Sequence, residues 1–172
     1  MTVPALAAED HSCPGCGVSY LDLTTATALE AIARVPARVR AAIDSVPASQ
    51  RRTRRCPHRW SVTEYAVHLR DVYAVSTIRL HRIRAEHRPV LEPMLNDLRV
   101  RRFRYNELDL TAVLAELTRN VDGLQEEAGR LAPWDWSRVA TRLPGETRSA
   151  LWLLRQAAHE GHHHILDISA CR

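Results

Sequence analysis

Apolar residues along this chain recur mainly every three or four positions, which is the spacing of one face of an amphipathic helix. This pattern predicts a first helix over residues 25–46, a second over 61–83 and a third over 109–131. A last helix is expected to begin near Thr147 and to continue past residue 166. No segment shows the strict alternation of a half-buried strand, so we expect an all-α fold.

A few residues mark where the predicted helices begin or are interrupted. Ser61 followed by Glu64 forms a capping-box pattern, in which each side chain accepts a hydrogen bond from a free backbone N–H group. Asp109 is the expected cap of the third helix. Pro36 lacks an N–H group and interrupts the first helix, so it either kinks that helix or belongs to the first turn of a second segment.

The segments between the predicted helices are long. Residues 47–59 form a loop rich in Arg and Pro, 89–107 form an irregular crossover, and 134–144 form a further connection. Four principal helices with long crossover connections indicate a four-helix bundle. We expect two parts, a polar lead-in with a cysteine knuckle over residues 1–23 and the helical bundle over 24–172.

The composition fits a single domain outside the membrane. At 172 residues with 45% hydrophobic residues, the chain is long enough to bury a substantial core. It contains no run of about 18 apolar residues, which a transmembrane helix requires. The first ten residues include acidic side chains and no basic stretch before an apolar core, so we expect no signal peptide and a cytoplasmic protein.

The net charge of +4 comes from arginine alone, because the chain contains no lysine. Two arginine-rich stretches, residues 51–55 and 99–104, have the charge to bind phosphate groups. Acidic residues are interspersed, and no pattern for stacking bases or reading a groove is present, so nucleic acid is not the expected partner. We expect a small-molecule substrate, anionic if arginines line the pocket, and a homodimer is compatible with a helical bundle.

Four histidines lie within six residues near the end of the sequence, at positions 159, 162, 163 and 164. Residues four apart share one face of a helix, so His159 and His163 can direct both imidazoles to one divalent metal ion. His68 lies on the inward face of the second predicted helix and supplies a third imidazole. We therefore predict a three-histidine site. His162 offers an alternative register, and His164 points about 100° away from His163.

Other interpretations of these histidines stay open at this point. A single histidine on an apolar helix face, such as His68, often forms a hydrogen bond with a core carbonyl group. The stretch from His159 to His163 also matches the His-Glu-x-x-His pattern of metalloproteases, with Glu160 as the acidic residue. We do not expect a protease, because a small helical bundle offers no edge strand to hold an extended peptide.

Acidic and aromatic residues close to the histidines are the catalytic candidates. Glu160, Asp71 and Asp167 can orient an imidazole or transfer a proton, although solvated surface carboxylates would follow the same spacing. Tyr65 lies one turn before His68 and is expected to line the pocket, with core packing as the alternative. Glu160, Tyr65 and Asp71 are therefore the predicted catalytic residues.

Four cysteines in a chain without a signal peptide point to metal or thiol chemistry before structural disulfides. Cys13 and Cys16 flank a tight Pro-Gly turn, which is typical of half a structural zinc site. Cys56 and His58 precede the second predicted helix and are the expected remaining ligands of this second, structural Zn²⁺. A redox-active Cys-x-x-Cys pair and plain reduced cysteines are the alternatives, and Cys171 has no predicted role.

Two stretches of the sequence together resemble the DinB/YfiT-like superfamily of metal-dependent four-helix bundles. They read Trp60-Ser61-x-x-Glu64-Tyr65-x-x-His68-x-Arg70-Asp71 and His159-Glu160-x-x-His163-His164-x-x-Asp167-Ile168. The similarity extends over residues 25–170, and it implies metal ligands from the second and fourth helices, here His68, His159 and His163. The Cys13-x-x-Cys16-Gly17 lead-in also resembles an actinobacterial branch of that family.

The resemblance implies a function as well as a fold. The family includes transferases and isomerases that use a low-molecular-weight thiol such as mycothiol or bacillithiol. We therefore expect a metal-dependent enzyme, a thiol-dependent S-transferase or isomerase acting on a small electrophile. A non-enzymatic metal- or ligand-binding bundle and a metal-dependent hydrolase are the alternatives. Zn²⁺ is the expected metal, although Ni²⁺, Fe²⁺ and Mn²⁺ also accept imidazole ligands.

Overall fold

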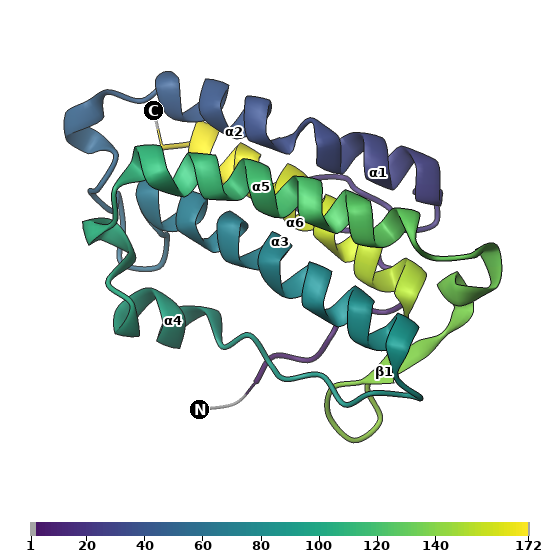
Figure 1. Ribbon diagram of the computed structural model, residues 1–172. Coiled ribbons are helices and arrows are strands. Elements are labelled where there is room, and N and C mark those ends of the chain that lie inside the picture. The colour runs from purple at the N-terminus through teal and green to yellow at the C-terminus, as the bar shows by residue number, and fades with distance from the viewer. Residues whose placement is uncertain (1–2, 172) are drawn as a thin grey trace.

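Helices make up most of the computed structural model, which describes residues 3–171 (Figure 1). None of the helices in that part of the chain is long and apolar enough to cross a membrane. The α-helices are α1 (Thr25–Ala33), α2 (Val35–Asp44), α3 (Val62–Ala85), α4 (Asn96–Arg102), α5 (Leu110–Gly129) and α6 (Ala150–Ser169). Short 3-10 turns cover Ala48–Gln50, Tyr105–Glu107 and Pro133–Ser137, and the strands are β1 (Val139–Thr141) and β2 (Thr147–Ser149).

The long helices form a bundle of four rods, because α1 and α2 follow one another along a single line (Figure 1). α6 packs against α1, α2 and α3, and α5 packs against α3. The interior holds the largest fully buried side chains, among them Trp152, Tyr73 and Leu117. This arrangement confirms the predicted four-helix bundle.

Pro36 lies just after the break that divides the first rod. It is in the first turn of α2, and Arg34 separates α1 from α2. A proline at that position removes no hydrogen bond, because the first N–H groups of a helix have no partner within it. The second of the two sequence interpretations is therefore confirmed, and the buried face continues across the break from Ile32 to Val39.

The start of α3 is fixed by the predicted capping box. The Ser61 N–H donates to Glu64 Oε2 (2.8 Å), and the Glu64 N–H donates to Ser61 Oγ (3.1 Å). Arg54 donates two further hydrogen bonds of 2.7 Å to the Glu64 carboxylate. The arginine-rich loop is thereby tied to the helix that carries His68.

The segment before α6 differs from the prediction. Thr147 does not begin the helix, because it lies in β2, which pairs antiparallel with β1. The helix begins at Ala150, and the Ser149 hydroxyl caps it by accepting a hydrogen bond from the Trp152 N–H (3.0 Å). Strands of three residues are too short to show an alternating pattern, so the sequence suggested none. The 89–107 crossover likewise contains α4 and a 3-10 turn instead of being irregular throughout.

The lead-in over residues 3–23 runs alongside α6 and is joined to it by hydrogen bonds. The Trp152 indole N–H donates to the Ala8 carbonyl (3.0 Å). The Glu9 carboxylate accepts hydrogen bonds from the Ser149 N–H (2.7 Å) and hydroxyl (2.9 Å), which places a negative charge at the positive end of the α6 dipole. The lead-in is therefore packed onto the bundle.

Gly161 brings α6 into close contact with α2 and α3. A Cβ atom at this position would overlap the Tyr73 hydroxyl and lie 2.6 Å from Val35 Cγ2. The Tyr73 hydroxyl donates to the Ala157 carbonyl (3.1 Å), one turn earlier in α6. These contacts hold the helix at a fixed rotation, and that rotation decides where the side chains before and after Gly161 point.

Candidate metal centre

α6 carries two pairs of candidate metal ligands, and the members of each pair are four residues apart. One pair is His159 and His163, and the other is Glu160 and His164. Successive residues of an α-helix are rotated by about 100°, so the two pairs face different neighbours. The first pair faces the lead-in, and the second faces α3.

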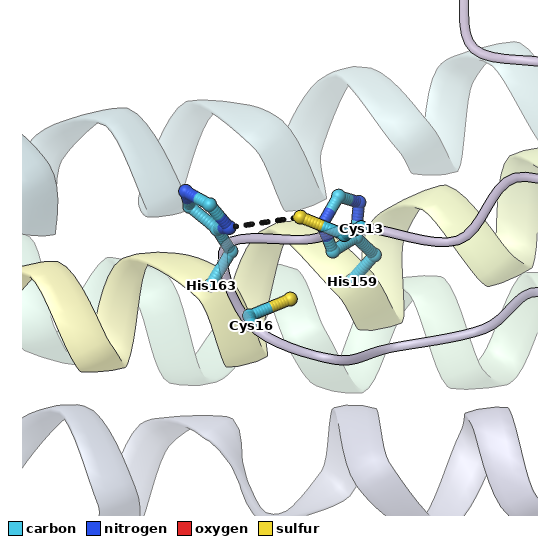
Figure 2. A group of neighbouring side chains, drawn as sticks. All are labelled: Cys13, Cys16, His159 and His163. Atoms are coloured by element: carbon cyan, nitrogen blue, oxygen red, sulfur yellow. Dashed lines mark hydrogen bonds between the residues drawn. The ribbon is translucent and has the colours of Figure 1, made fainter.

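The first pair meets two cysteines from the lead-in, and we call these four residues the Cys–His cluster. Its members are Cys13, Cys16, His159 and His163, whose candidate ligand atoms all lie within 4.8 Å of one another. Figure 2 shows the lead-in loop running along α6 and the contact between Cys13 and His163. The Cys13 Sγ atom is 3.6 Å from His163 Nδ1. Both thiols are free, so all four side chains can act as donors.

The turn between the two cysteines is closed by backbone hydrogen bonds. The Gly17 N–H donates to the Cys13 carbonyl (2.8 Å), and the Cys13 N–H donates to the Val18 carbonyl (2.9 Å). Gly17 has a φ of 75°, a conformation that glycine adopts without steric cost. A Cβ atom at Gly15 would lie 3.2 Å from His163 Cε1, so glycine lets the turn rest against that imidazole.

His159 is held by the lead-in but has an unsatisfied nitrogen. Its Nδ1 atom is 3.2 Å from the Tyr20 hydroxyl, whereas its Nε2 atom is buried and has no hydrogen-bond partner among residues 3–171. Burial lowers the pKa of His159 to about 4, so the imidazole is neutral near neutral pH, which is the form that binds metals. A buried nitrogen without a partner is rare in folded proteins.

His68, Glu160 and His164 form the second group, which we call the His–Glu cluster. His68 is buried on α3, and its Nε2 atom lies 3.2 Å from Glu160 Oε2. The His164 Nε2 atom lies 3.2 Å from the same oxygen, and its Nδ1 atom lies 2.9 Å from Asp167 Oδ2. The candidate ligand atoms of the three clustered residues lie within 4.8 Å of one another.

These contacts set the charges of the His–Glu cluster. Burial alone would raise the pKa of Glu160, but hydrogen bonds with His164 and His68 hold it well below its ordinary value. Burial lowers the pKa of His68, and the contact with Glu160 does not compensate. For His164, burial lowers the pKa, but hydrogen bonds with Asp167 and Glu160 outweigh it and raise the pKa to about 9. The cluster therefore contains a carboxylate, a neutral imidazole and an imidazolium.

Aromatic rings surround the His–Glu cluster. The Trp60 ring centroid is 4.9 Å from that of His68, and the Tyr65 ring centroid is 5.2 Å from that of His164. Burial raises the pKa of Tyr65 to about 12, so its phenol stays protonated near neutral pH. Trp60 lines the adjacent cavity, whereas Tyr65 is buried and does not line it. The position of Tyr65 therefore favours the packing interpretation over the predicted pocket lining.

A cavity of about 490 Å³ opens beside the His–Glu cluster. His68 and Glu160 line part of this cavity, as do His159 of the Cys–His cluster and residues 3–7 of the lead-in. Arg79 and Arg142 bring positive charge to the lining. Arg142 is paired with Glu146 (2.8 Å), whereas Arg79 forms no ion pair with a carboxylate in the described part of the chain. Arg79 is therefore the arginine best able to meet a negative charge inside the cavity.

Comparison with known proteins identifies the family to which this architecture belongs. A family model for the DinB superfamily matches residues 31–168, which is most of the chain. The chain belongs to the DinB superfamily. The resemblance seen in the sequence is thereby confirmed.

One solved structure shows how closely this DinB-superfamily chain follows a known fold. It is that of YfiT from Bacillus subtilis, described as a probable metal-dependent hydrolase with an unusual four-helix bundle topology. The TM-score is 0.79 and the sequence identity is 20%, with 86% of this chain and 85% of YfiT covered. At this identity the similarity shows a shared fold. A search of curated proteins returned no match.

The candidate ligands of this DinB-superfamily chain fall into two groups, and the predicted set of three histidines is divided between them. The sequence grouped His68 with His159 and His163, but the structure places His68 in the His–Glu cluster, next to Glu160. It also places His164 there, which points away from His163 as expected and faces His68 and Glu160. Both ligand pairs have the same spacing of four, so periodicity did not separate them. The carboxylate three residues after His164 was the available signal, because it orients that imidazole.

The partners expected for the cysteine pair also differ. Cys56 and His58 lie in the loop before α3, and neither belongs to a group of metal-capable side chains within residues 3–171. His159 and His163 occupy the places that the sequence assigned to those two residues. The physical reason is that the lead-in folds back along α6, a long-range contact that no local pattern records.

Asp71 takes part in an ion-pair network away from the cavity. Its carboxylate accepts hydrogen bonds from the Tyr105 hydroxyl (2.5 Å) and Arg99 Nη2 (2.6 Å), and Arg70 Nη2 lies 2.7 Å away. Burial would raise the pKa of Asp71, but the hydrogen bonds from Tyr105 and Arg99 lower it. The network joins α3 to α4 and does not line the cavity, so its geometry does not support the predicted catalytic role.

Proposed function

We propose that this DinB-superfamily chain is a metal-dependent enzyme whose metal ligands are His68, Glu160 and His164. The observation that supports this most is the convergence of the three donors, two of which, His68 and Glu160, line a cavity that can hold a small substrate. Catalytic zinc sites commonly combine three protein ligands with one open position for water or substrate. Two histidines and one glutamate are among the known combinations.

The donor set fits a divalent cation, which on binding would displace the proton that Asp167 and Glu160 hold on His164. The His164 Nδ1 atom contacts Asp167, which leaves its Nε2 atom directed toward Glu160. Carboxylates that contact the outer nitrogen of a metal-binding histidine in this way fix its tautomer and orientation. Zn²⁺ suits such a mixture of nitrogen and oxygen donors, and Mn²⁺, Fe²⁺ and Ni²⁺ accept it as well.

The cavity lining suggests what the neighbouring residues do. A divalent cation, when bound, would lower the pKa of a coordinated water or thiol and polarise an electrophilic substrate. Trp60 and residues 3–7 line the cavity, and Arg79 offers a positive charge to an anionic substrate group. Small anionic molecules are therefore the proposed substrate class.

Two reactions are consistent with such a site, and they differ in the nucleophile. The set of two histidines and one glutamate occurs in zinc hydrolases, and YfiT is described as a probable metal-dependent hydrolase, so we propose hydrolysis first. Thiol-dependent S-transfer or isomerisation, which the sequence pattern suggested, is the second candidate. A volume of about 490 Å³ can hold a low-molecular-weight thiol such as mycothiol together with a small electrophile.

The deciding experiment measures turnover by the full-length protein loaded with one metal at a time. Hydrolysis of small anionic esters and amides is followed with and without an added low-molecular-weight thiol. We expect turnover that does not require the thiol and that falls at least about 100-fold in His68→Ala and Glu160→Gln. The matched control is His162→Gln, on the same helical turn but outside both clusters.

Three other results would change the proposal. Turnover that requires the thiol would replace hydrolysis by S-transfer or isomerisation. Tight metal binding that is lost in His68→Ala, with no turnover of either kind, would favour a non-enzymatic metal- or ligand-binding protein. Unchanged metal content in His68→Ala would reject the site itself.

A further inference from the structure

We propose that Cys13, Cys16, His159 and His163 bind a second zinc ion, which has a structural role and fixes the lead-in to α6. These residues are distinct from the three donors of the His–Glu cluster, so the proposal stands whether or not the proposed enzyme activity is found. Two cysteines and two histidines are a common donor set of structural zinc sites, in which protein ligands fill all four positions.

The spacing of the donor atoms matches a tetrahedral zinc site. With Zn–S bonds of about 2.3 Å and Zn–N bonds of about 2.0 Å, neighbouring sulfur and nitrogen ligands lie roughly 3.5 Å apart. The distance from Cys13 Sγ to His163 Nδ1 is 3.6 Å, and no two of the four donor atoms are more than 4.8 Å apart. Small side-chain rotations therefore suffice to surround one ion with all four donors.

The unsatisfied nitrogen of His159 is a second, independent observation. Its Nε2 atom is buried without a hydrogen-bond partner in the part of the chain that the structure describes. When the Nδ1–H group donates to the Tyr20 oxygen, 3.2 Å away, the Nε2 lone pair is free to bind a metal. A zinc ion thus accounts for a nitrogen that no protein group satisfies, and Tyr20 fixes the required tautomer.

The backbone of the lead-in presents the two cysteines as a unit. Ser12 and Ser19 pair across the turn in an antiparallel bridge, which closes it at its base. Gly15 rests against the His163 ring, and Gly17 has a positive φ. Two cysteines that flank a tight, glycine-containing turn commonly supply half of a structural zinc site.

A redox-active cysteine pair explains the geometry less well. Catalytic Cys-x-x-Cys pairs usually lie at a helix N-terminus, which favours the thiolate. After this turn the next helix of the described chain is α1, which begins only at Thr25. A disulfide between Cys13 and Cys16 would also leave the Nε2 atom of His159 without a partner. Zinc binding accounts for all four side chains together.

A zinc ion at this position would help to shape the cavity. Residues 3–7 line the cavity, and they belong to the same segment as the cysteine turn. Hydrogen bonds near the start of α6, such as that from Trp152 to Ala8, hold this segment at one point. Zinc would hold it at a second point, further along α6, and so limit movement of the cavity wall, which His159 also lines.

Cobalt substitution distinguishes this site from the His–Glu cluster. Untagged full-length protein is reduced, freed of metal with a chelator and titrated with Co²⁺. We expect a thiolate-to-cobalt charge-transfer band in the near ultraviolet, lost in Cys13→Ser and Cys16→Ser. The band should persist in His68→Ala, which alters only the other cluster. In His159→Gln the affinity for Co²⁺ should fall at least about tenfold, because one of four ligands is lost.

The remaining thiols provide matched controls. Cys56→Ser and Cys171→Ser remove thiols outside the Cys–His cluster, so the band should keep its full intensity in both. Loss of the band in Cys56→Ser would support the ligand set expected from the sequence and overturn this one. Absence of the band from the reduced, folded parent protein would also overturn it.

X-ray absorption tests the site even if the cysteine variants fail to fold. The zinc-loaded His68→Ala protein should show two sulfur ligands at about 2.3 Å and two nitrogen ligands at about 2.0 Å. A shell of nitrogen and oxygen alone would reject the site. The anchoring role is tested by hydrogen exchange, because zinc should slow the exchange of lead-in amides at least about tenfold. Equal exchange with and without zinc would show that the ion does not fix the segment.

Discussion

The two faces of α6 carry the same ligand spacing but differ in what packs against them. His159 and His163 meet a turn that brings two thiols, whereas Glu160 and His164 meet a single imidazole from α3. The first cluster has four donors, one of which, His159, lines the cavity, and the second has three donors, of which His68 and Glu160 line it. A pair of ligands four residues apart therefore does not define a site by itself, because the element that packs against it supplies the remaining donors.

The donors also differ in chemical character. Thiolates are soft ligands that favour Zn²⁺, whereas a carboxylate with two imidazoles accepts a wider range of divalent ions. Four protein ligands suit a structural role, and three leave a position for a reacting molecule. The same helix is therefore expected to hold two metals with different functions, and this contrast can be tested one cluster at a time.

Removing the charge of Glu160 should lower metal affinity most strongly, and this loss should be confined to the His–Glu cluster. Glu160→Gln replaces a charged donor by a neutral amide, so the metal affinity of the His–Glu cluster should fall at least about 100-fold. Metal content by mass spectrometry should fall from about two ions per chain to about one, with the cobalt–thiolate band unchanged. Simultaneous loss of both metals would contradict the independence of the clusters.

Gly161→Ala should disturb both clusters at once. The added methyl group overlaps the Tyr73 hydroxyl and crowds Val35, so the free energy of unfolding should fall by about 2–3 kcal/mol. Denaturant unfolding measures this change. Gly123→Ala in α5 is the matched control, because a Cβ atom there meets nothing within 4 Å and should stabilise the helix by up to about 1 kcal/mol. Unchanged stability in Gly161→Ala would show that these contacts do not fix the rotation of α6.

Asp167 contacts both clusters, so its substitution should weaken metal binding at both, but to different extents. Its Oδ2 atom lies 2.9 Å from His164 Nδ1 and 3.6 Å from His163 Nε2. Asp167→Asn should lower the metal affinity of the His–Glu cluster about tenfold, because the orienting carboxylate also strengthens the basicity of its imidazole. The longer contact predicts a smaller effect on the Cys–His cluster. Zinc titration calorimetry measures both, and a larger loss at the Cys–His cluster would reverse the assigned roles.

Asp71→Asn should leave both clusters unchanged and lower stability by about 1 kcal/mol. The folded-state pKa of Asp71 is below its unfolded value, so its contribution is complete above about pH 4 and is lost as the pH falls through the folded-state pKa. Parent and variant should therefore differ in thermal unfolding near neutral pH and converge in strong acid. Loss of turnover with normal metal content and stability would instead support the catalytic role that the sequence suggested for Asp71.

Most of the helical fold could be predicted from the sequence, because helix periodicity and caps are local properties. The capping box of Ser61 and Glu64 located the start of α3, and Asp109 caps α5 as expected. The β1–β2 hairpin and α4 could not be predicted in the same way. Both elements are short. The β1–β2 hairpin leads directly into α6 and contacts the lead-in, so tertiary contacts stabilise the hairpin more than its own sequence pattern does.

The residue types of the candidate site could be predicted, but their grouping could not. His159 and Glu160 are neighbours in sequence, yet about 100° of helix rotation directs them to different partners. Close packing at Gly161 sets that rotation, and it depends on residues from α2 and α3. The partners of Cys13 and Cys16 were also hidden, because they lie at the opposite end of the sequence.

The Cys–His cluster also has a consequence for how the chain is made. Cys13 and Cys16 are translated before their histidine partners, which follow about 145 residues and on the order of ten seconds later. Until then the lead-in has no α6 to pack against, and its two thiols remain open to oxidants. Closure of the lead-in therefore has to wait for α6, and only a nascent chain that extends through that helix can complete it. A chain released too early would keep two exposed thiols, which distinguishes it chemically from a finished one.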